Sequence, residues 1–266
     1  MNRIDTRFAK LRANQRTALI PFVTAGDPLP DATVELMHAL VEAGADLIEL
    51  GVPFSDPMAD GPVIQHADER ALHNKVGIAG ILQWVREFRE RDSETPVVLM
   101  GYLNPIEIHG IARFARDAVA AGVDGVLVVD CPIEEDATLR PLRDAGLARI
   151  LLAAPTTSDA RLAHAVEAAE GYLYYVSFAG ITGAAKLSTS DIAQRVRGLR
   201  EHSKVPVAVG FGIKDAGSAS SVAAFADAVV IGSALVATLA DARTSDDACQ
   251  RARAFLAPIR GALDRR

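Results

Sequence analysis

The sequence predicts an α/β fold in which eight parallel strands and their helices close into a (β/α)₈ barrel. Short apolar runs recur eight times along the 266 residues, and amphipathic stretches lie between them. Most runs are continuously apolar, which is typical of strands buried on both faces of a parallel sheet. The chain also has about the length expected for such a barrel. An open, doubly wound sheet is the alternative that fits the same alternation.

Before the first strand, the chain opens on a stretch rich in arginine. Ile4, Phe8 and Leu11 are spaced as on one face of a helix, so we expect a helix that docks on the barrel. A targeting peptide is the alternative, but Asp5 departs from the acid-free composition of such segments.

The strands and helices then follow in order. The predicted strands are residues 18–23, 46–50, 96–100, 125–129, 149–153, 173–176, 206–209 and 228–231. The predicted helices between them are residues 32–43, 80–91, 111–121, 134–145, 159–169 and 191–201. Gly44, Gly122 and Gly146 follow three helices at the place of a left-handed cap.

Two insertions and a final helix complete the pattern. There is room for an extra helix around residues 63–73, and residues 177–190 form a long polar segment after the sixth strand. Both insertions follow strands and would lie at the C-terminal face of a barrel, where active sites form and long loops act as lids. Residues 246–263 are expected to close the outer ring. No linker or composition shift divides the chain, so we expect one domain over residues 1–266.

The composition excludes several classes of protein. Hydrophobic residues make up 50% of the chain, charged residues 23% and aromatic residues 5%, and the formal charge is −6. This balance argues against nucleic-acid or anionic-membrane binding, and no apolar run is long enough to span a bilayer. Cys131 and Cys249 are too few for a disulfide scaffold and have no metal-site spacing, so a cytoplasmic location and no metal are expected.

Glu49 lies at the C-terminal end of the second predicted strand, among apolar neighbours. Burial disfavours the charged carboxylate, so its pKa should rise toward the range useful for general acid–base catalysis. A structural salt bridge is the alternative role. Asp60 follows in a loop restricted by three prolines, which could hold its carboxylate over the barrel mouth. Asp60 and Asp56 could instead cap a turn or the helix after Pro62, and for Asp56 a surface role is expected.

The loops after the last two strands are rich in glycine, with Gly210 and Gly212 in one and Gly232 and Ser233 in the other. Phosphate sites of barrel enzymes are often built there from backbone N–H groups and a short helix, and Gly183 could add a further N–H. Apolar side chains at strand ends could line a flat slot beside that site; they are Phe22, Met100, Tyr102, Leu127, Tyr174 and Phe211. Core packing is the alternative for each of them.

The motifs closely resemble those of the tryptophan synthase alpha chain family. The resemblance runs from about Phe8 to the C-terminus, and its most specific segment is ELGVPFSDPMADGP at 49–62. The other matching segments are 22–28, 100–106, 180–183 and 210–213. Lys214 departs from the family pattern, because small hydroxyl residues are common there, and Met58 stands where leucine is frequent.

The resemblance implies a (β/α)₈ barrel that cleaves indole-3-glycerol phosphate to indole and glyceraldehyde 3-phosphate. It implies that Glu49 is the acid–base residue and that Asp60 binds the indole N–H. The implied phosphate cradle is Gly183, Phe211, Gly212, Gly232 and Ser233, with Thr182 closing over it. Phe22, Met100, Leu127 and Tyr174 would flank the indole.

The same resemblance implies a partner, a beta chain that carries pyridoxal phosphate, in an αββα complex through which indole is channelled. The implied contact residues are Pro53, Asp56, Asn104 and Pro132, and no cofactor is expected in this chain. Two other functions stay open at this point. One is a sugar-phosphate isomerase or another phosphate-binding barrel lyase, and the other is an activating subunit with little catalysis of its own.

Overall fold

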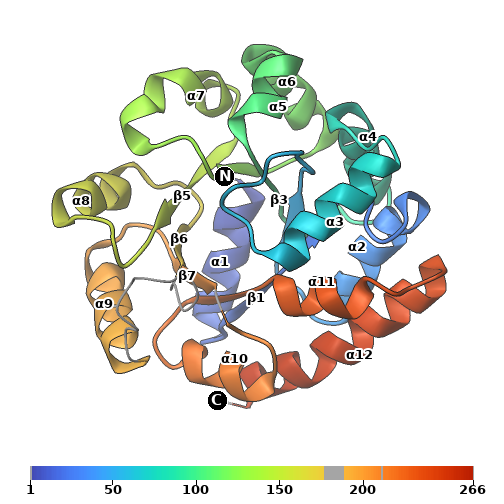
Figure 1. The fold of residues 1–266 in the computed structure, drawn as a ribbon. Coiled ribbons are helices and arrows are strands. Elements are labelled where there is room, and N and C mark those ends of the chain that lie inside the picture. Colours follow the sequence, from blue (N-terminus) through green and yellow to red (C-terminus); the bar gives the residue numbers. More distant parts are fainter. Residues whose placement is uncertain (1, 177–188, 211, 266) are drawn as a thin grey trace.

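A computed structural model describes residues 2–176, 189–210 and 212–265. In this part of the chain the eight strands are parallel and form a closed barrel in the order β1 to β8 (Figure 1). They are β1 (Ala18–Thr24), β2 (Ile48–Gly51), β3 (Val97–Gly101), β4 (Gly125–Val128), β5 (Ala148–Ala153), β6 (Leu173–Val176), β7 (Val207–Gly210) and β8 (Ala228–Ile231). Pairing of β1 with β8, as in Ala18 with Ala228, closes the ring and rules out the open sheet.

The helices surround this barrel, as predicted for most of them. They are α1 (Arg3–Ala13), α2 (Thr33–Glu42), α3 (Pro62–His73), α4 (Ile78–Arg89), α5 (Leu103–His109), α6 (Ile111–Ala121), α7 (Asp136–Asp144), α8 (Asp159–Ala168), α9 (Thr189–His202), α10 (Ala216–Ala223), α11 (Ser233–Leu239) and α12 (Ser245–Asp264), with 3₁₀ turns η1 (Pro30–Ala32) and η2 (Ile133–Glu135). Gly44, Gly122 and Gly146 all have φ between 90° and 98°, which confirms the predicted left-handed residues after α2, α6 and α7.

The helices α5 and α10 had no counterpart in the sequence prediction, and for α11 only a short helix at the phosphate site was expected, without a residue range. α5 has only seven residues and contains Pro105, so it is too short to show a helical period. α10 consists mostly of Ala, Ser and Gly, which give little contrast between an apolar and a polar face. Its start is fixed instead by a capping box, in which Asp215 and Ser218 each bond the other's backbone N–H.

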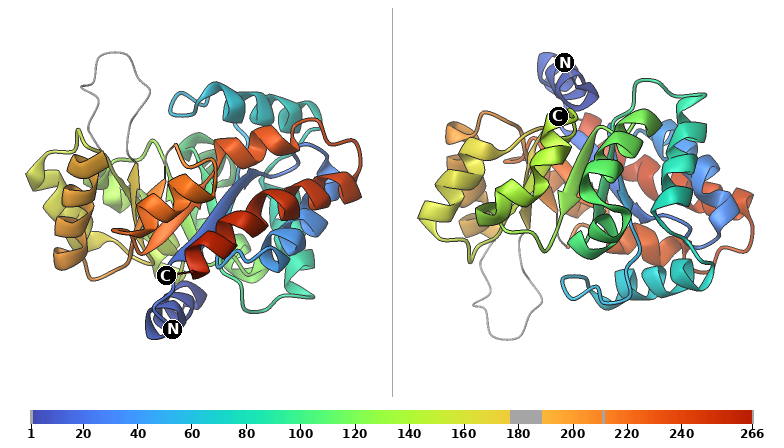
Figure 2. Two further views of the ribbon diagram at one scale, coloured as in Figure 1. Left: turned by 90° about the horizontal axis from the view of Figure 1, so that it is seen from below. Right: turned by 90° about the horizontal axis from the view of Figure 1, so that it is seen from above.

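Side chains of each strand alternate between two cores. Leu47, Leu127 and Tyr172 belong to the cluster inside the barrel, whereas Ile48 and Leu50 pack outward against the helices. The inner cluster also contains Ile4, Phe8 and Leu11 of α1, so the predicted docking helix closes one end of the barrel. Figure 2 shows α1 at that end, opposite α3.

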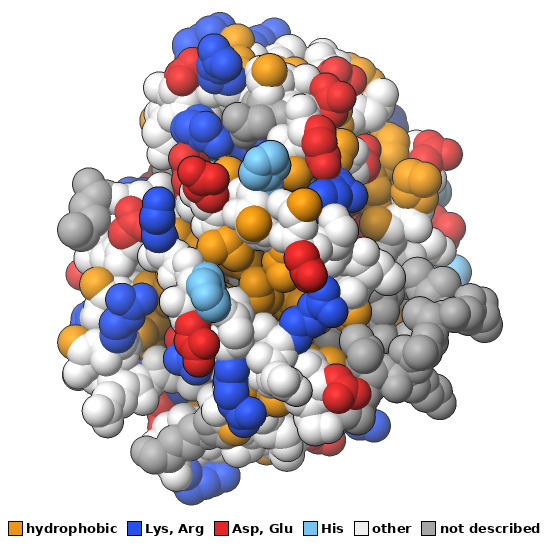
Figure 3. Space-filling model, turned by 90° about the vertical axis from the view of Figure 1, so that its left-hand side faces the viewer, with side chains coloured by type: hydrophobic (Ala, Val, Ile, Leu, Met, Phe, Trp, Pro, Cys, Tyr) orange, Lys and Arg blue, Asp and Glu red, His pale blue; other side chains and the backbone are white. Residues whose placement is uncertain are grey.

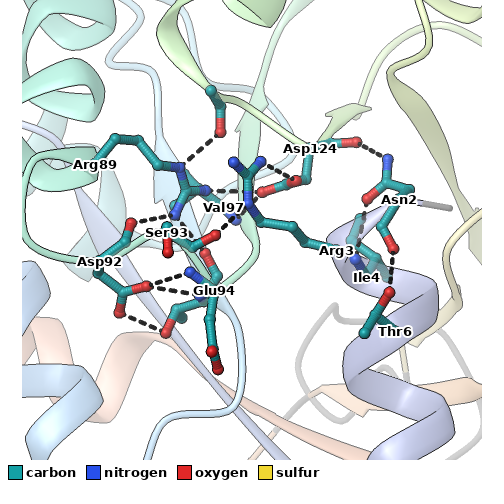
Figure 4. Close-up of polar contacts among 12 residues, drawn as sticks. Asn2, Arg3, Ile4, Thr6, Arg89, Asp92, Ser93, Glu94, Val97 and Asp124 are labelled. Carbon is teal, nitrogen blue, oxygen red and sulfur yellow. Dashed lines mark hydrogen bonds and ion pairs between the residues drawn. The ribbon is translucent and has the colours of Figure 1, made fainter.

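Polar contacts fasten α1 to the barrel (Figure 4). The buried Asp124 accepts from Arg3 at 2.9 Å, from Arg89 at 2.8 Å and from the backbone N–H of Val97 at 2.9 Å. Asn2 caps α1 and donates its side-chain amide to the carbonyl of Asp124 at 2.7 Å. A buried carboxylate that is matched by two guanidinium groups and an N–H is satisfied, and it ties α1 and α4 to the base of the barrel.

The outer surface carries both signs of charge. On the side that Figure 3 shows, basic and acidic side chains are interspersed. Ion pairs such as Arg161–Glu134 (2.8 Å) and Arg143–Glu170 (3.1 Å) join neighbouring elements. Within the residues that the structure describes, no helix is long and apolar enough to cross a membrane.

Candidate active site

A cavity of about 810 Å³ opens at the C-terminal ends of the strands. Residues of, or directly after, β1 to β8 line it, so the residues predicted at strand ends come together as the barrel geometry requires. Its lining includes Phe22, Glu49, Asp60, Met100, Pro132, Tyr174, Gly212, Gly232 and Ser233. Both predicted carboxylates and three of the predicted phosphate-cradle residues therefore share one space.

Glu49 points into the barrel because it alternates with the outward-facing Ile48 and Leu50 on β2. Its side chain is completely buried, and Oε1 accepts a hydrogen bond from the hydroxyl of Tyr172 at 2.5 Å. Oε2 has no hydrogen-bond partner among the described residues. Burial raises the pKa of Glu49 from 4.5 to about 7, although the Tyr172 bond opposes the rise. The predicted direction is confirmed, and near neutral pH this carboxyl can both give and take a proton.

Asp60 lies at the end of the loop between β2 and α3. Its Oδ2 accepts a hydrogen bond from the hydroxyl of Tyr102 at 2.7 Å, and the same hydroxyl accepts from the N–H of Ala59 at 3.0 Å. Burial raises the pKa of Asp60 above its usual value. The residue that caps α3 is Gly61, so the alternative role of Asp60 as a helix cap is wrong. Asp60 instead lines the same cavity as Glu49.

Tyr102 also packs against the tilted ring of Phe54, which belongs to the loop of Asp60, with ring centroids 5.1 Å apart. The side-chain amide of Gln65 on α3 donates to the backbone carbonyl of Asp60 at 2.8 Å. These contacts hold the loop from both ends, because Tyr102 follows β3 and Gln65 lies one turn into α3. The Asp60 carboxylate is thereby fixed in position before any substrate arrives.

The predicted apolar slot is only partly found. Phe22, Met100 and Tyr174 line the cavity, whereas Tyr102 is not in its lining and donates its hydroxyl hydrogen bond to Asp60. Leu127 does not reach the cavity wall, since it is fully buried in the inner cluster below. Gly210 leaves room for Tyr174, because a Cβ at this position would overlap the tyrosine hydroxyl and the ring would have to shift.

The structure describes only some residues of the predicted phosphate cradle. Gly212 has φ +65°, and Gly232 immediately precedes α11, which begins at Ser233. All three residues line the cavity at the ends of β7 and β8. Thr182, Gly183 and Phe211 lie outside the described residues.

Sequence reasoning assigned no role to three residues at or near the cavity: Tyr172 and Asp68 near the carboxylates, and Lys214 on the side of β7. Tyr172 could have been found from the period of two on β6, which places it on the same inward face as Tyr174. Asp68 is buried on α3 and accepts from Thr24 at 3.3 Å and from the N–H of Phe54 at 3.4 Å. Burial raises the pKa of Asp68 to about 7. Lys214 lines the cavity after Gly212.

Two other aspartates at the ends of strands make structural contacts. Asp27 is buried and accepts two hydrogen bonds from Arg70, at 2.6 and 3.1 Å. Asp130 accepts from the N–H of Leu103 at 2.8 Å, at the start of α5. The described residues contain no group of three or more His, Cys, Asp or Glu side chains that could hold a metal ion.

The predicted partner contacts occupy the same end of the barrel. Pro53 and Asn104 line a second hollow of about 750 Å³, together with Phe54, Ser55 and Ile108. Asp56 is exposed next to this hollow, and Pro132 lies on the rim of the first cavity. Met58 and Ile108, which are 86% and 80% exposed, are the two most exposed large apolar side chains among the described residues.

Comparison with known proteins is consistent along the whole chain. The family model described as tryptophan synthase alpha chain matches residues 8–262. The tryptophan synthase alpha chain of Xylella fastidiosa strain 9a5c is 63% identical over 265 residues, covering 99% of each chain. That of Xanthomonas euvesicatoria is 62% identical over 268 residues, covering 100% of each.

Solved structures agree. The tryptophan synthase subunit alpha of Legionella pneumophila superposes with a TM-score of 0.93 at 48% identity, covering 99% of each chain. A chain of tryptophan synthase from M. tuberculosis in its aminoacrylate-bound form gives a TM-score of 0.87 at 35% identity, covering 99% of this chain and 100% of that one.

Proposed function

The chain belongs to the tryptophan synthase alpha chain family, and from this premise we propose how its residues perform the reaction. It is the alpha subunit that cleaves indole-3-glycerol phosphate, with indole passed to a beta subunit. The finer assignment is a carbon–carbon lyase that runs a retro-aldol cleavage. The observation that carries it is the buried Glu49, whose Oε2 is unpartnered among the described residues at a cavity shared with Asp60 and the glycine loops.

Protonated Glu49 gives its proton to C3 of the indole, and the ring becomes a cation. The bond between C3 and the glycerol carbon then breaks, and its electron pair returns to the ring as neutral indole. At the same time the hydroxyl on that carbon loses its proton to the Glu49 carboxylate and becomes the aldehyde of glyceraldehyde 3-phosphate. The net change moves one proton from oxygen to carbon and restores Glu49. A carboxyl with a pKa of about 7 suits both halves of this cycle.

Asp60 accepts the indole N–H and stabilises the positive charge that develops on the ring. Tyr102 fixes that carboxylate by its 2.7 Å hydrogen bond. Phe22, Met100 and Tyr174 supply the apolar contact for the flat ring, whereas Leu127 supports them from the core. The phosphate rests on Gly212, Gly232 and Ser233, with Thr182, Gly183 and Phe211 as further members of the cradle.

The partner is a beta chain in an αββα heterotetramer, and pyridoxal phosphate belongs to that chain rather than to this one. Pro53, Asp56, Asn104 and Pro132 form the contact. The exposed Met58 and Ile108 support this surface, because apolar side chains exposed near a hollow mark interaction sites. The complex would reside in the cytoplasm.

The test is indole release from indole-3-glycerol phosphate by the purified chain, with and without a beta chain. Glu49→Gln removes the transferable proton but keeps the volume of the side chain, and should abolish release in both conditions. Asp60→Asn should lower the rate by about 10²- to 10³-fold, the loss typical of an electrostatic stabiliser. Glu170→Gln is the matched control, because Glu170 bonds the N–H of Arg149 away from the cavity lining.

Other outcomes identify the alternatives. A folded wild type that binds the substrate but releases no indole under either condition would overturn the lyase proposal and leave a phosphate-binding barrel. A wild type that activates the beta chain without releasing indole would be an activating subunit.

A further inference from the structure

Lys214 follows the glycine turn at the end of β7 and lines the cavity next to Gly212 and Ile213. Its backbone is held in place, since its N–H donates to the Ser218 hydroxyl at 3.1 Å within the capping box of α10. A long, exposed side chain thus starts from a fixed point at the cavity rim.

The charges around the cavity are separated by sign. Its charged lining residues, in the part of the chain that the structure describes, are Glu49, Asp60, Asp130, Arg161 and Lys214. Glu49 and Asp60 lie on β2 and the loop after it. Lys214 lies after β7, three strands away around the ring through β8 and β1.

Of the two cations, only Lys214 forms no ion pair with a described residue. Its charge does act on the neighbouring Asp215, whose pKa is lowered first by the bonds from Ser218 and to a lesser extent by Lys214. Arg161 is paired with Glu134 through contacts of 2.8 and 3.0 Å. The acid nearest Lys214 in sequence, Asp215, is occupied by the N–H and hydroxyl of Ser218, each at 2.7 Å. No described residue forms an ion pair with Lys214.

We propose that Lys214 is a substrate-binding residue that contacts the phosphate group of the substrate and adds net positive charge to a cradle otherwise built from backbone N–H groups. A phosphate monoester carries a charge of about −1.5 to −2 at pH 7, and lysine is a common point-charge partner for it. Because the Asp60 carboxylate follows β2 on the other side of the cavity, the lysine also orients the substrate: the phosphate is attracted toward β7 and repelled from Asp60. This inference rests on the proposed function, which supplies a phosphorylated substrate.

Lys214→Gln should raise the KM for indole-3-glycerol phosphate about 3- to 10-fold, the effect of one exposed charge pair with a doubly charged partner. The inhibition constants of inorganic phosphate and glycerol 3-phosphate should rise by the same factor, with a smaller change in kcat. Lys214→Arg should restore most of the affinity. The difference between wild type and Lys214→Gln should shrink as NaCl rises from about 20 mM to about 300 mM, because salt screens exposed charges.

The matched control is Lys204→Gln, which removes an exposed lysine just before the other end of β7. It should leave both constants at the wild-type values. Inhibition by free indole, which has no phosphate, should be unchanged in Lys214→Gln. Equal phosphate inhibition constants in wild type and Lys214→Gln at low salt would overturn the inference while indole release still supported the proposed function. A wild type that neither releases indole nor binds phosphate would overturn the proposed function itself.

Discussion

The hydrogen bond from Tyr172 to Glu49 sets the pH at which the proposed acid–base residue works. Tyr172→Phe removes the donor at 2.5 Å and leaves Glu49 without a described hydrogen-bond partner on either oxygen. A hydrogen bond to a charged group is worth about 1.5 to 3 kcal/mol, and one pKa unit corresponds to about 1.4 kcal/mol. The pKa of Glu49, about 7 in the wild type, should therefore rise by about 1 to 2 units in the variant.

The proposed reaction starts from protonated Glu49, so activity should fall as pH rises through this pKa. With a pKa of about 7, roughly 3% of Glu49 is protonated at pH 8.5; with a pKa of about 8.5, about half is. Tyr172→Phe should keep a much larger share of its own maximal kcat/KM at pH 8.5, even if that maximum is lower. Initial rates of indole release between pH 5.5 and 9.5 measure the shift.

Tyr175→Phe is the matched control on the same strand. Tyr175 is equally buried but packs outward, and its hydroxyl has no hydrogen-bond partner among the described residues. Its loss should leave the pH profile unchanged. An alkaline limb at the same pH in wild type and Tyr172→Phe would refute the reasoning, because the hydrogen bond would then not stabilise the Glu49 carboxylate.

Three further predictions concern stability and packing. Because burial raises the pKa of Glu49 from 4.5 to about 7, its contribution to stability is complete below pH 4.5 and is lost as pH rises to about 7. Glu49→Gln should thus lose about 2.5 kcal/mol less free energy of unfolding than wild type between pH 5 and pH 8, and urea titrations showing equal losses would contradict this. Asp124→Ala removes the carboxylate that balances the buried charge of Arg89 and leaves the N–H of Val97 without its acceptor. It should lower the free energy of unfolding by about 3 to 5 kcal/mol in urea titrations, whereas the exposed Asp5→Ala should change it by under about 0.5. Gly210→Ala should raise the KM for indole-3-glycerol phosphate without unfolding the barrel, since its Cβ displaces Tyr174 in the cavity wall; an unchanged KM would show that the tyrosine has another place to go.

The barrel was predictable because its signals are local. Residues 228–231 are continuously apolar, and Gly122 directly follows a helical pattern. A strand and a helix cap can therefore each be recognised from a few consecutive residues. All eight predicted strands match observed strands to within two residues at either end. α5 and α10 were missed because short helices of this composition are defined by their caps and neighbours rather than by a hydrophobic period.

The candidate site was predictable only as a set of positions. Strand order alone brings the ends of β2, β7 and β8 to one face, so Glu49, Gly212 and Gly232 could be assigned together from the sequence. Leu127 shows the limit, because an inward-facing residue near a strand end can line the cavity or support it from below. Two residues further along the same face, Val129 does line the cavity. The contacts of Tyr172 and Tyr102 with the two carboxylates also lay beyond the sequence.

The sequence by itself determined the alternation of strands and helices, the burial that raises the pKa of Glu49, and the family resemblance. Only the tertiary structure decided which groups meet: Tyr172 with Glu49 across 123 residues, Tyr102 with Asp60 across 42, and Lys214 with the cavity. The physical reason is that a carboxyl's pKa and orientation depend on atoms within a few ångströms in space. In a closed barrel those atoms come from strands far apart in the chain, so no local pattern records them.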